Sequence, residues 1–135
     1  MPSPARSVRL FLGIAGVLLL LQGSASLLRA ALSISVPELV LAFTNADPLH
    51  AVIHITWGLV MLLALVLPVT EYAQALLVLI FGVFYTMLAF LGTLVYHPLG
   101  LQLGIGENVF HFVVGPLALI LAYRALRRRA AMRRV

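Results

Sequence analysis

The chain has 135 residues, of which 63% are apolar and only 10% charged, and its mean hydropathy is +1.13. A water-soluble domain has about 45–50% apolar and about 25% charged residues, so this composition excludes a soluble globular protein. It predicts a single integral membrane domain over 1–135. Because there is no cysteine, disulfides, thiolate metal sites and cysteine nucleophiles are excluded, and His, Asp, Glu and Asn remain as metal ligands.

The net charge of +5 comes from arginines gathered near the C-terminal end. All nine basic residues are Arg, and six of them follow Tyr123. No aromatic residues are interleaved with these charges, which argues against nucleic acid as a partner. We expect 124–135 to be a basic cytoplasmic tail that lies against anionic lipid headgroups, so the lipid bilayer is the expected partner.

The first apolar segment, 8–28, is long enough to span a membrane, which takes about 20 residues. A signal peptide is the alternative, because a basic start, an apolar run and the small residues at 23–26 also fit that pattern. The internal repeat described below favours a retained span. The segment 29–44 follows, and its apolar piece 37–43 is short and predicts an interfacial helical turn.

The second span begins with a helix-start signal. Asp47 is the expected N-cap and Pro48 the first helical residue. The span covers about 49–67 and is stopped by Pro68. The connection 68–72 is so short that it predicts antiparallel packing with the next helix.

The third span, about 73–95, contains no charged residue. A Gly-rich loop follows up to Gly106, and we expect His97 to lie in this wet loop and outside any site. The fourth span covers about 107–123.

The distribution of arginine predicts the orientation of the four spans. With both termini cytoplasmic, eight of the nine Arg lie inside and only Arg29 lies outside. The expected topology is therefore N-in/C-in.

Small residues recur in a pattern typical of a duplicated helical hairpin. The first and third spans share steps of three, four and three residues, at Gly13, Gly16, Leu20 and Gly23 and at Gly82, Tyr85, Ala89 and Gly92. The second and fourth spans each place a Gly four residues after a His, at His54–Gly58 and His111–Gly115. Two parallel repeats would produce this pattern, and so would chance, because Gly is common in membrane helices. In either case the small residues predict seams where helices pack closely.

Polar residues gather at the outer end of the predicted bundle. His50 and His54 are four residues apart and share one helix face, as do Glu107 and His111. Ionisable groups in a membrane helix are costly unless they are paired or functional. This cluster is therefore the candidate site.

Two interpretations of the cluster involve a cofactor. In the first, His50, His54, Glu107 and His111 hold a divalent metal, since imidazole and carboxylate suit Zn, Fe, Cu or Mn and bundles build metal sites from facing helices. In the second, His54 and His111 are the axial ligands of a b-type haem, because the repeat places them at matching depth. Either would make the protein a membrane redox protein.

The third interpretation is structural. The imidazoles would hydrogen-bond across helices, while Asp47, Asn45 and Asn108 form a polar network of helix caps. Proton or small-molecule handling is a further alternative. No nucleotide loop, Ser-His-Asp set or Gly-x-Ser-x-Gly motif is present, so only the metal or haem interpretation would make an enzyme. On the structural interpretation, the protein is a small accessory membrane protein that packs against itself or other membrane proteins.

These motifs resemble a known family over about 8–123. The chain is similar to the bacterial four-helix membrane proteins gathered as domain of unknown function 4383. The similarity is carried by three features: N-x-x-PLH-x-x-x-H with a later Gly, a third helix with Gly and Tyr, and EN-x-x-H-x-x-x-G. The matching residues are Asn45, Pro48, Leu49, His50, His54, Gly58, Gly82, Tyr85, Gly92, Asn108, His111 and Gly115. Glu107 stands where the family usually has Asp. The resemblance implies an all-α four-helix integral membrane bundle in the bacterial plasma (inner) membrane, and it implies no activity.

Overall fold

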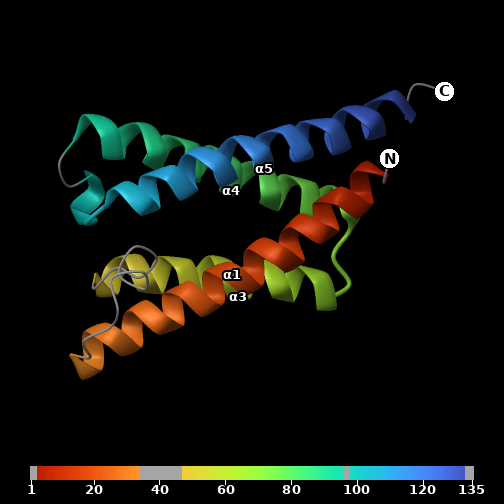
Figure 1. The fold of residues 1–135 in the computed structure, drawn as a ribbon. Coiled ribbons are helices and arrows are strands. Elements are labelled where there is room, and N and C mark those ends of the chain that lie inside the picture. Colours follow the sequence, from red (N-terminus) through yellow and green to blue (C-terminus); the bar gives the residue numbers. More distant parts are fainter. Residues whose placement is uncertain (1–2, 34–46, 96–97, 133–135) are drawn as a thin grey trace.

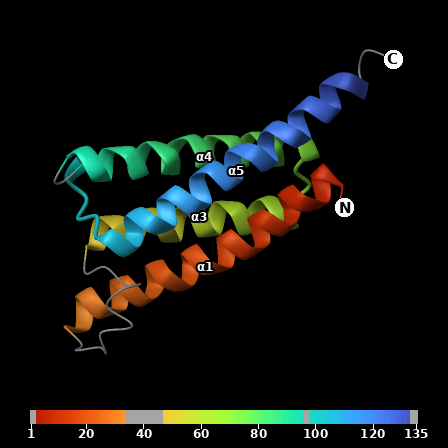
Figure 2. The same cartoon turned by 45° about the horizontal axis from the view of Figure 1, so that its top comes forward.

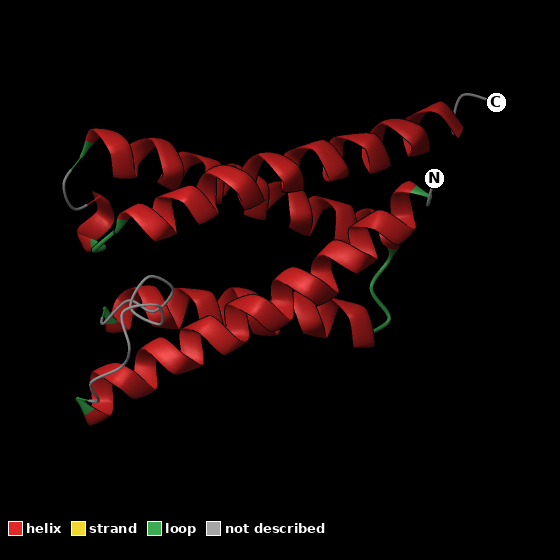
Figure 3. Ribbon diagram, viewed as in Figure 1, coloured by secondary structure: helices red, strands yellow, loops and turns green. Residues whose placement is uncertain are grey.

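A computed structural model describes residues 3–33, 47–95 and 98–132, and this part of the chain is helical without a strand (Figure 3). Four of its helices are long and apolar enough to cross a membrane, which confirms the all-α four-span prediction. The elements are α1 (Pro4–Leu32), α3 (Pro48–Val66), α4 (Glu71–Leu94), the short 3₁₀-helix η1 (Pro98–Gly100) and α5 (Ile105–Met132).

Local capping explains where α1 and α3 begin. Ser3 caps α1, because its side chain accepts a hydrogen bond from the backbone N–H of Arg6. Asp47 caps α3 in the same way, with its Oδ1 2.9 Å from the backbone nitrogen of Leu49, and Pro48 is the first helical residue. The predicted start of the second span is confirmed.

The end of α3 is determined by a proline and supported by a buried glutamine. Pro68 has no N–H to donate to the carbonyl of Ala64, four residues earlier, so the helix ends at Val66. The side chain of Gln74, at the start of α4, donates to that carbonyl at 2.7 Å. The connection between α3 and α4 is therefore held by a hydrogen bond as well as by its short length.

The helices pack as two hairpins, α1 with α3 and α4 with α5 (Figures 1 and 2). The N- and C-terminal ends lie at the same end of the bundle in both views. The hairpins meet around a core of buried side chains from all four helices, among them Leu12, Leu19, Met61, Phe81, Tyr85 and Ala118. Many large apolar side chains remain exposed on the outside, as a lipid-facing surface requires.

Glycines form the seam within each hairpin. A Cβ atom on Gly58 would lie 2.8 Å from the carbonyl oxygen of Gly16 and from the backbone nitrogen of Leu20. A Cβ atom on Gly115 would lie 2.7 Å from the backbone nitrogen of Thr86. Only hydrogen fits at these distances, so the predicted small-residue seams are confirmed.

Helices α1 and α5 extend further at both ends than the apolar spans predicted from sequence. Helix α5 continues to Met132, so most of the basic segment 124–135 prolongs a membrane helix. Arg, Ala and Leu are strong helix formers, which is why the helix does not end where the apolar run ends. The predicted interfacial turn 37–43 lies outside the described residues.

Candidate metal centre

Three histidines from two helices converge near the end of the bundle where α3 and α5 begin. His50 and His54 come from α3 and His111 from α5, and one ligand nitrogen of each lies within 4.8 Å of the others. His54 and His111 are each the seventh residue of their helix, about 9 Å from its start at about 1.5 Å per residue. The two residues therefore have the same place in their helices. All three side chains are buried, and none is more than 3% exposed.

Aromatic rings enclose the three imidazoles. The ring centroids of His50 and His54 are 4.3 Å apart, those of His50 and His111 5.8 Å, and those of His54 and His111 6.3 Å. The ring of Tyr85 from α4 lies 5.0 Å from His111 and 6.0 Å from His54. Phe110 lies 6.0 Å from its neighbour His111. The site thus lies between the two hairpins, where α3, α4 and α5 all contribute.

Several buried polar atoms of this cluster have no hydrogen-bond partner among the described residues. They are Nε2 of His54, both ring nitrogens of His111 and the hydroxyl of Tyr85. A buried polar atom without a partner costs about 1–3 kcal/mol, and native proteins keep few of them. The structural interpretation required imidazole hydrogen bonds across the helices. Within 3–33, 47–95 and 98–132, no such bond is formed by His54 Nε2 or by either ring nitrogen of His111.

Asp47 and Glu107 hold the two helix starts beside the cluster. Asp47 Oδ2 accepts the backbone N–H of Gln102 at 3.0 Å, which joins the start of α3 to the segment before α5. Glu107 Oε2 accepts the backbone N–H of Gly104 at 2.5 Å, the arrangement of a residue that supports its own helix start. Glu107 is not among the converging residues, so the structure brings together the three histidines of the predicted four-residue metal set.

Asn108 has a different role from the predicted helix cap. It lies within the first turns of α5, and its Nδ2 donates to the carbonyl oxygen of Gly92 in α4 at 3.0 Å. A side chain at Gly92 would overlap with this amide, so the glycine is what lets Asn108 reach the carbonyl. Asn45 and His97 lie outside the described residues.

Tyr85 is the member of the site that sequence analysis placed in a helix stripe and did not propose as a site residue. Its side chain is fully buried and stacks on Phe81 at 4.1 Å between ring centroids. A signal did exist, because Tyr85 takes the position that Gly16 has in the matching stripe of the first span. A large polar-tipped ring in a stripe of small residues indicates a special contact.

Comparison of the chain with protein-family models, curated proteins and solved structures found no match. The resemblance to the bacterial four-helix family therefore stays a prediction. The site is interpreted below from its own geometry.

Proposed function

We propose that this four-span membrane protein binds one transition-metal ion through His50, His54 and His111. The observation that carries the proposal is the convergence of three buried imidazoles, with ligand nitrogens within 4.8 Å of one another. Tetrahedral zinc with bonds of about 2.0–2.1 Å places its ligand nitrogens about 3.3 Å apart. Small side-chain rotations would therefore close the site around an ion.

The donor atoms favour a particular group of metals. Imidazole suits Zn, Cu, Fe and Ni, whereas Mg and Ca take oxygen ligands. Three protein ligands leave a fourth position open, an arrangement found in catalytic zinc sites rather than structural ones. The buried hydroxyl of Tyr85, from the facing helix, is suited to hydrogen-bond a water or hydroxide held there.

A metal ion fits this site better than a b-type haem. A porphyrin between His54 and His111 would have to displace His50 and Tyr85, because the rings of both lie within 6.0 Å of both histidines. A single ion requires no such displacement. The third imidazole, which a bis-histidine haem would not use, becomes a ligand in the metal site.

The surroundings offer compensation for a buried positive charge. Neutral imidazoles do not neutralise a divalent ion, and an uncompensated charge in a membrane is costly. The carboxyl groups of Asp47 and Glu107 are buried at the same end of the bundle. They place negative charge beside the site without occupying its ligand positions.

Metal analysis of detergent-purified protein tests the proposal. After loading with Zn²⁺ or the optical probe Co²⁺, we expect one ion per chain in the wild type. His54→Ala and His111→Ala should each lose the ion, because two imidazoles do not hold it. Glu107→Gln is the matched control and should still bind one ion at saturating metal, because its carboxyl lies outside the ligand set. Its affinity should be lower, because one of the two compensating charges is lost. A wild-type protein that stays metal-free, or an His54→Ala/His111→Ala variant that still binds one ion, would contradict the proposal.

We also infer that both termini are cytoplasmic, in the plasma membrane of a bacterium, and that the hairpins are duplicates. The Arg distribution and the common location of the two chain ends support the orientation (Figure 1). The pairing of α1 with α3 and of α4 with α5 supports duplication. So does the matching place of Gly58 and Gly115, each the eleventh residue of its helix and each in a hairpin seam.

The absence of cysteine makes this topology testable by labelling. We expect a membrane-impermeant maleimide to label Ile105→Cys in intact bacterial cells, because this exposed residue starts α5 at the outer end. Ser3→Cys, at the other end, should react only after the membrane is permeabilised. The reverse pattern would show that the orientation is inverted.

A further inference from the structure

A basic cavity of about 670 Å³ lies where α1 begins and α5 ends. Arg124, Arg127 and Arg128 line it from α5, and Pro4 and Ser7 line it from α1. The three arginines are spaced so that one helix face carries them. None of them forms an ion pair with a carboxylate of the described residues, so their charges remain for a ligand from outside the chain.

An apolar groove of about 380 Å³ lies next to this cavity. Ser7 and Leu121 line both spaces, so the two are adjacent. The groove lies between α1 and α5 and extends from Leu121 to Phe110, about 17 Å at about 1.5 Å per residue. Its other side chains are apolar: Leu10, Phe11, Ile14, Ala15, Leu18, Val114 and Leu117.

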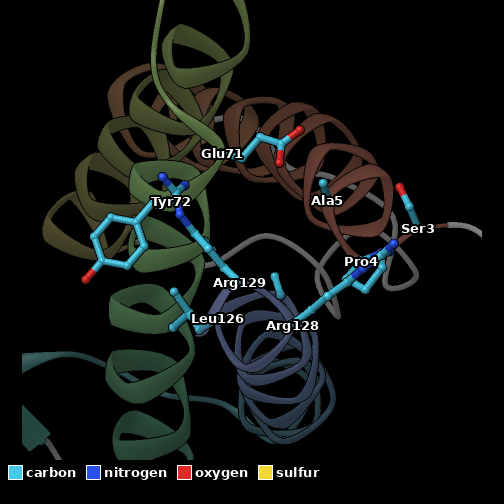
Figure 4. A pocket seen from close by; sticks show the side chains of 10 residues that line it. Ser3, Pro4, Ala5, Glu71, Tyr72, Leu126, Arg128 and Arg129 are labelled. Atoms are coloured by element: carbon cyan, nitrogen blue, oxygen red, sulfur yellow. The ribbon is translucent and has the colours of Figure 1, made fainter. Parts of the chain in front are cut away.

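A second cavity, of about 470 Å³, shares Pro4 and Arg128 with the first one (Figure 4). Arg129 lies over the ring of Tyr72 there, 5.2 Å from its centroid, and Glu71 adds a carboxylate. Arg128 extends toward Pro4. This cavity contains both signs of charge, whereas the cavity beside Arg124 and Arg127 contains only positive charge. An anion is therefore favoured on the Arg124 side.

We propose that the basic cavity and the apolar groove together bind one anionic phospholipid. Its phosphate would pair with Arg124 and Arg127, since guanidinium groups bind phosphate with two parallel hydrogen bonds. One acyl chain would lie along the groove between α1 and α5. Free phosphate would occupy only the basic cavity, and a neutral lipid would occupy mainly the apolar groove. An anionic phospholipid is the ligand whose headgroup matches the cavity and whose acyl chain matches the groove. Basic pockets between membrane helices bind such headgroups.

Native mass spectrometry in detergent tests the headgroup contact. We expect the wild type to retain one phosphatidylglycerol and to bind it at least tenfold more tightly than phosphatidylcholine of the same chains. Arg124→Gln/Arg127→Gln should remove this preference. Arg6→Gln/Arg9→Gln is the matched control, because it removes the same charge from α1 without touching the cavity, and it should keep the preference.

A second pair of variants tests the acyl-chain contact. Ile14→Trp should fill the groove and weaken phosphatidylglycerol binding several-fold, whereas Val17→Trp, on an exposed face of α1 that does not line the groove, should not. Inorganic phosphate at millimolar concentration should not displace the lipid. Three results would each overturn the proposal: equal binding of the two lipids, a preference that is kept in the double Arg variant, or displacement of the lipid by phosphate.

Discussion

Replacing His111 with Leu should make the metal-free protein more stable, by about 1–3 kcal/mol in free energy of unfolding. His111 is fully buried, and neither ring nitrogen has a hydrogen-bond partner among the described residues. An apolar side chain of similar size removes this cost and leaves the surrounding packing nearly unchanged. The measurement is denaturant unfolding in detergent after treatment with a chelator.

Saturating metal should reverse this order of stability. At a Zn²⁺ concentration of 1,000 times Kd, binding to the folded state alone stabilises the wild type by about 4.1 kcal/mol, which exceeds the advantage expected for the Leu variant, and His111→Leu should gain nothing. This reversal in the order of stability on adding metal is expected for a metal site and not for a structural hydrogen-bond network. If His111→Leu were less stable than the wild type without metal, the imidazole would be a stabilising hydrogen-bonding group.

Gln74→Leu is the control for this experiment. Gln74 is also a buried polar residue, but its side chain is hydrogen-bonded to the carbonyl of Ala64 at 2.7 Å. Losing that bond leaves a helix-end carbonyl without a donor, so the variant should be less stable by about 1–3 kcal/mol. The opposite signs of the two Leu variants would show that hydrogen bonding, rather than polarity alone, decides the effect.

Gly58→Ala should destabilise the bundle by about 1–3 kcal/mol or more, despite the better helix propensity of Ala. The new Cβ atom would lie 2.8 Å from backbone atoms of Gly16 and Leu20 in α1. Backbone cannot rotate away as a flexible side chain can, so α1 and α3 would have to separate. The same unfolding measurement reports the loss.

Gly13→Ala is the matched control on the same hairpin. Its Cβ atom would lie 3.6 Å from the Cδ1 atom of Leu65, an ordinary contact with a side-chain end. We expect no loss, and up to about 1 kcal/mol of gain from helix propensity. Equal losses at Gly58 and Gly13 would mean that the seam is not as close as the structure places it.

The features of the fold that could be predicted from the sequence depend on interactions between residues that are close together in the chain. Hydropathy, proline stops and N-caps act within a few residues, so the four spans and the cap at Asp47 could be read from the chain. The helix ends beyond the apolar runs could not, because helix propensity carries α5 through the basic segment to Met132. The spacing of His50 and His54 likewise established a shared face, since one helical turn determines it.

The sequence by itself thus determined an all-α membrane bundle and a histidine-rich end, because hydropathy and helical periodicity are local properties. Only the tertiary structure decided which polar groups meet. It confirmed the predicted meeting of His111 with the α3 histidines and added Tyr85 to them. It left Glu107 at its own helix start and Asn108 on the carbonyl of Gly92. The physical reason is that spacing determines which residues share a helix face, whereas the rotation of each helix about its axis depends on packing. Here glycine seams and buried side chains from distant parts of the chain determine that packing.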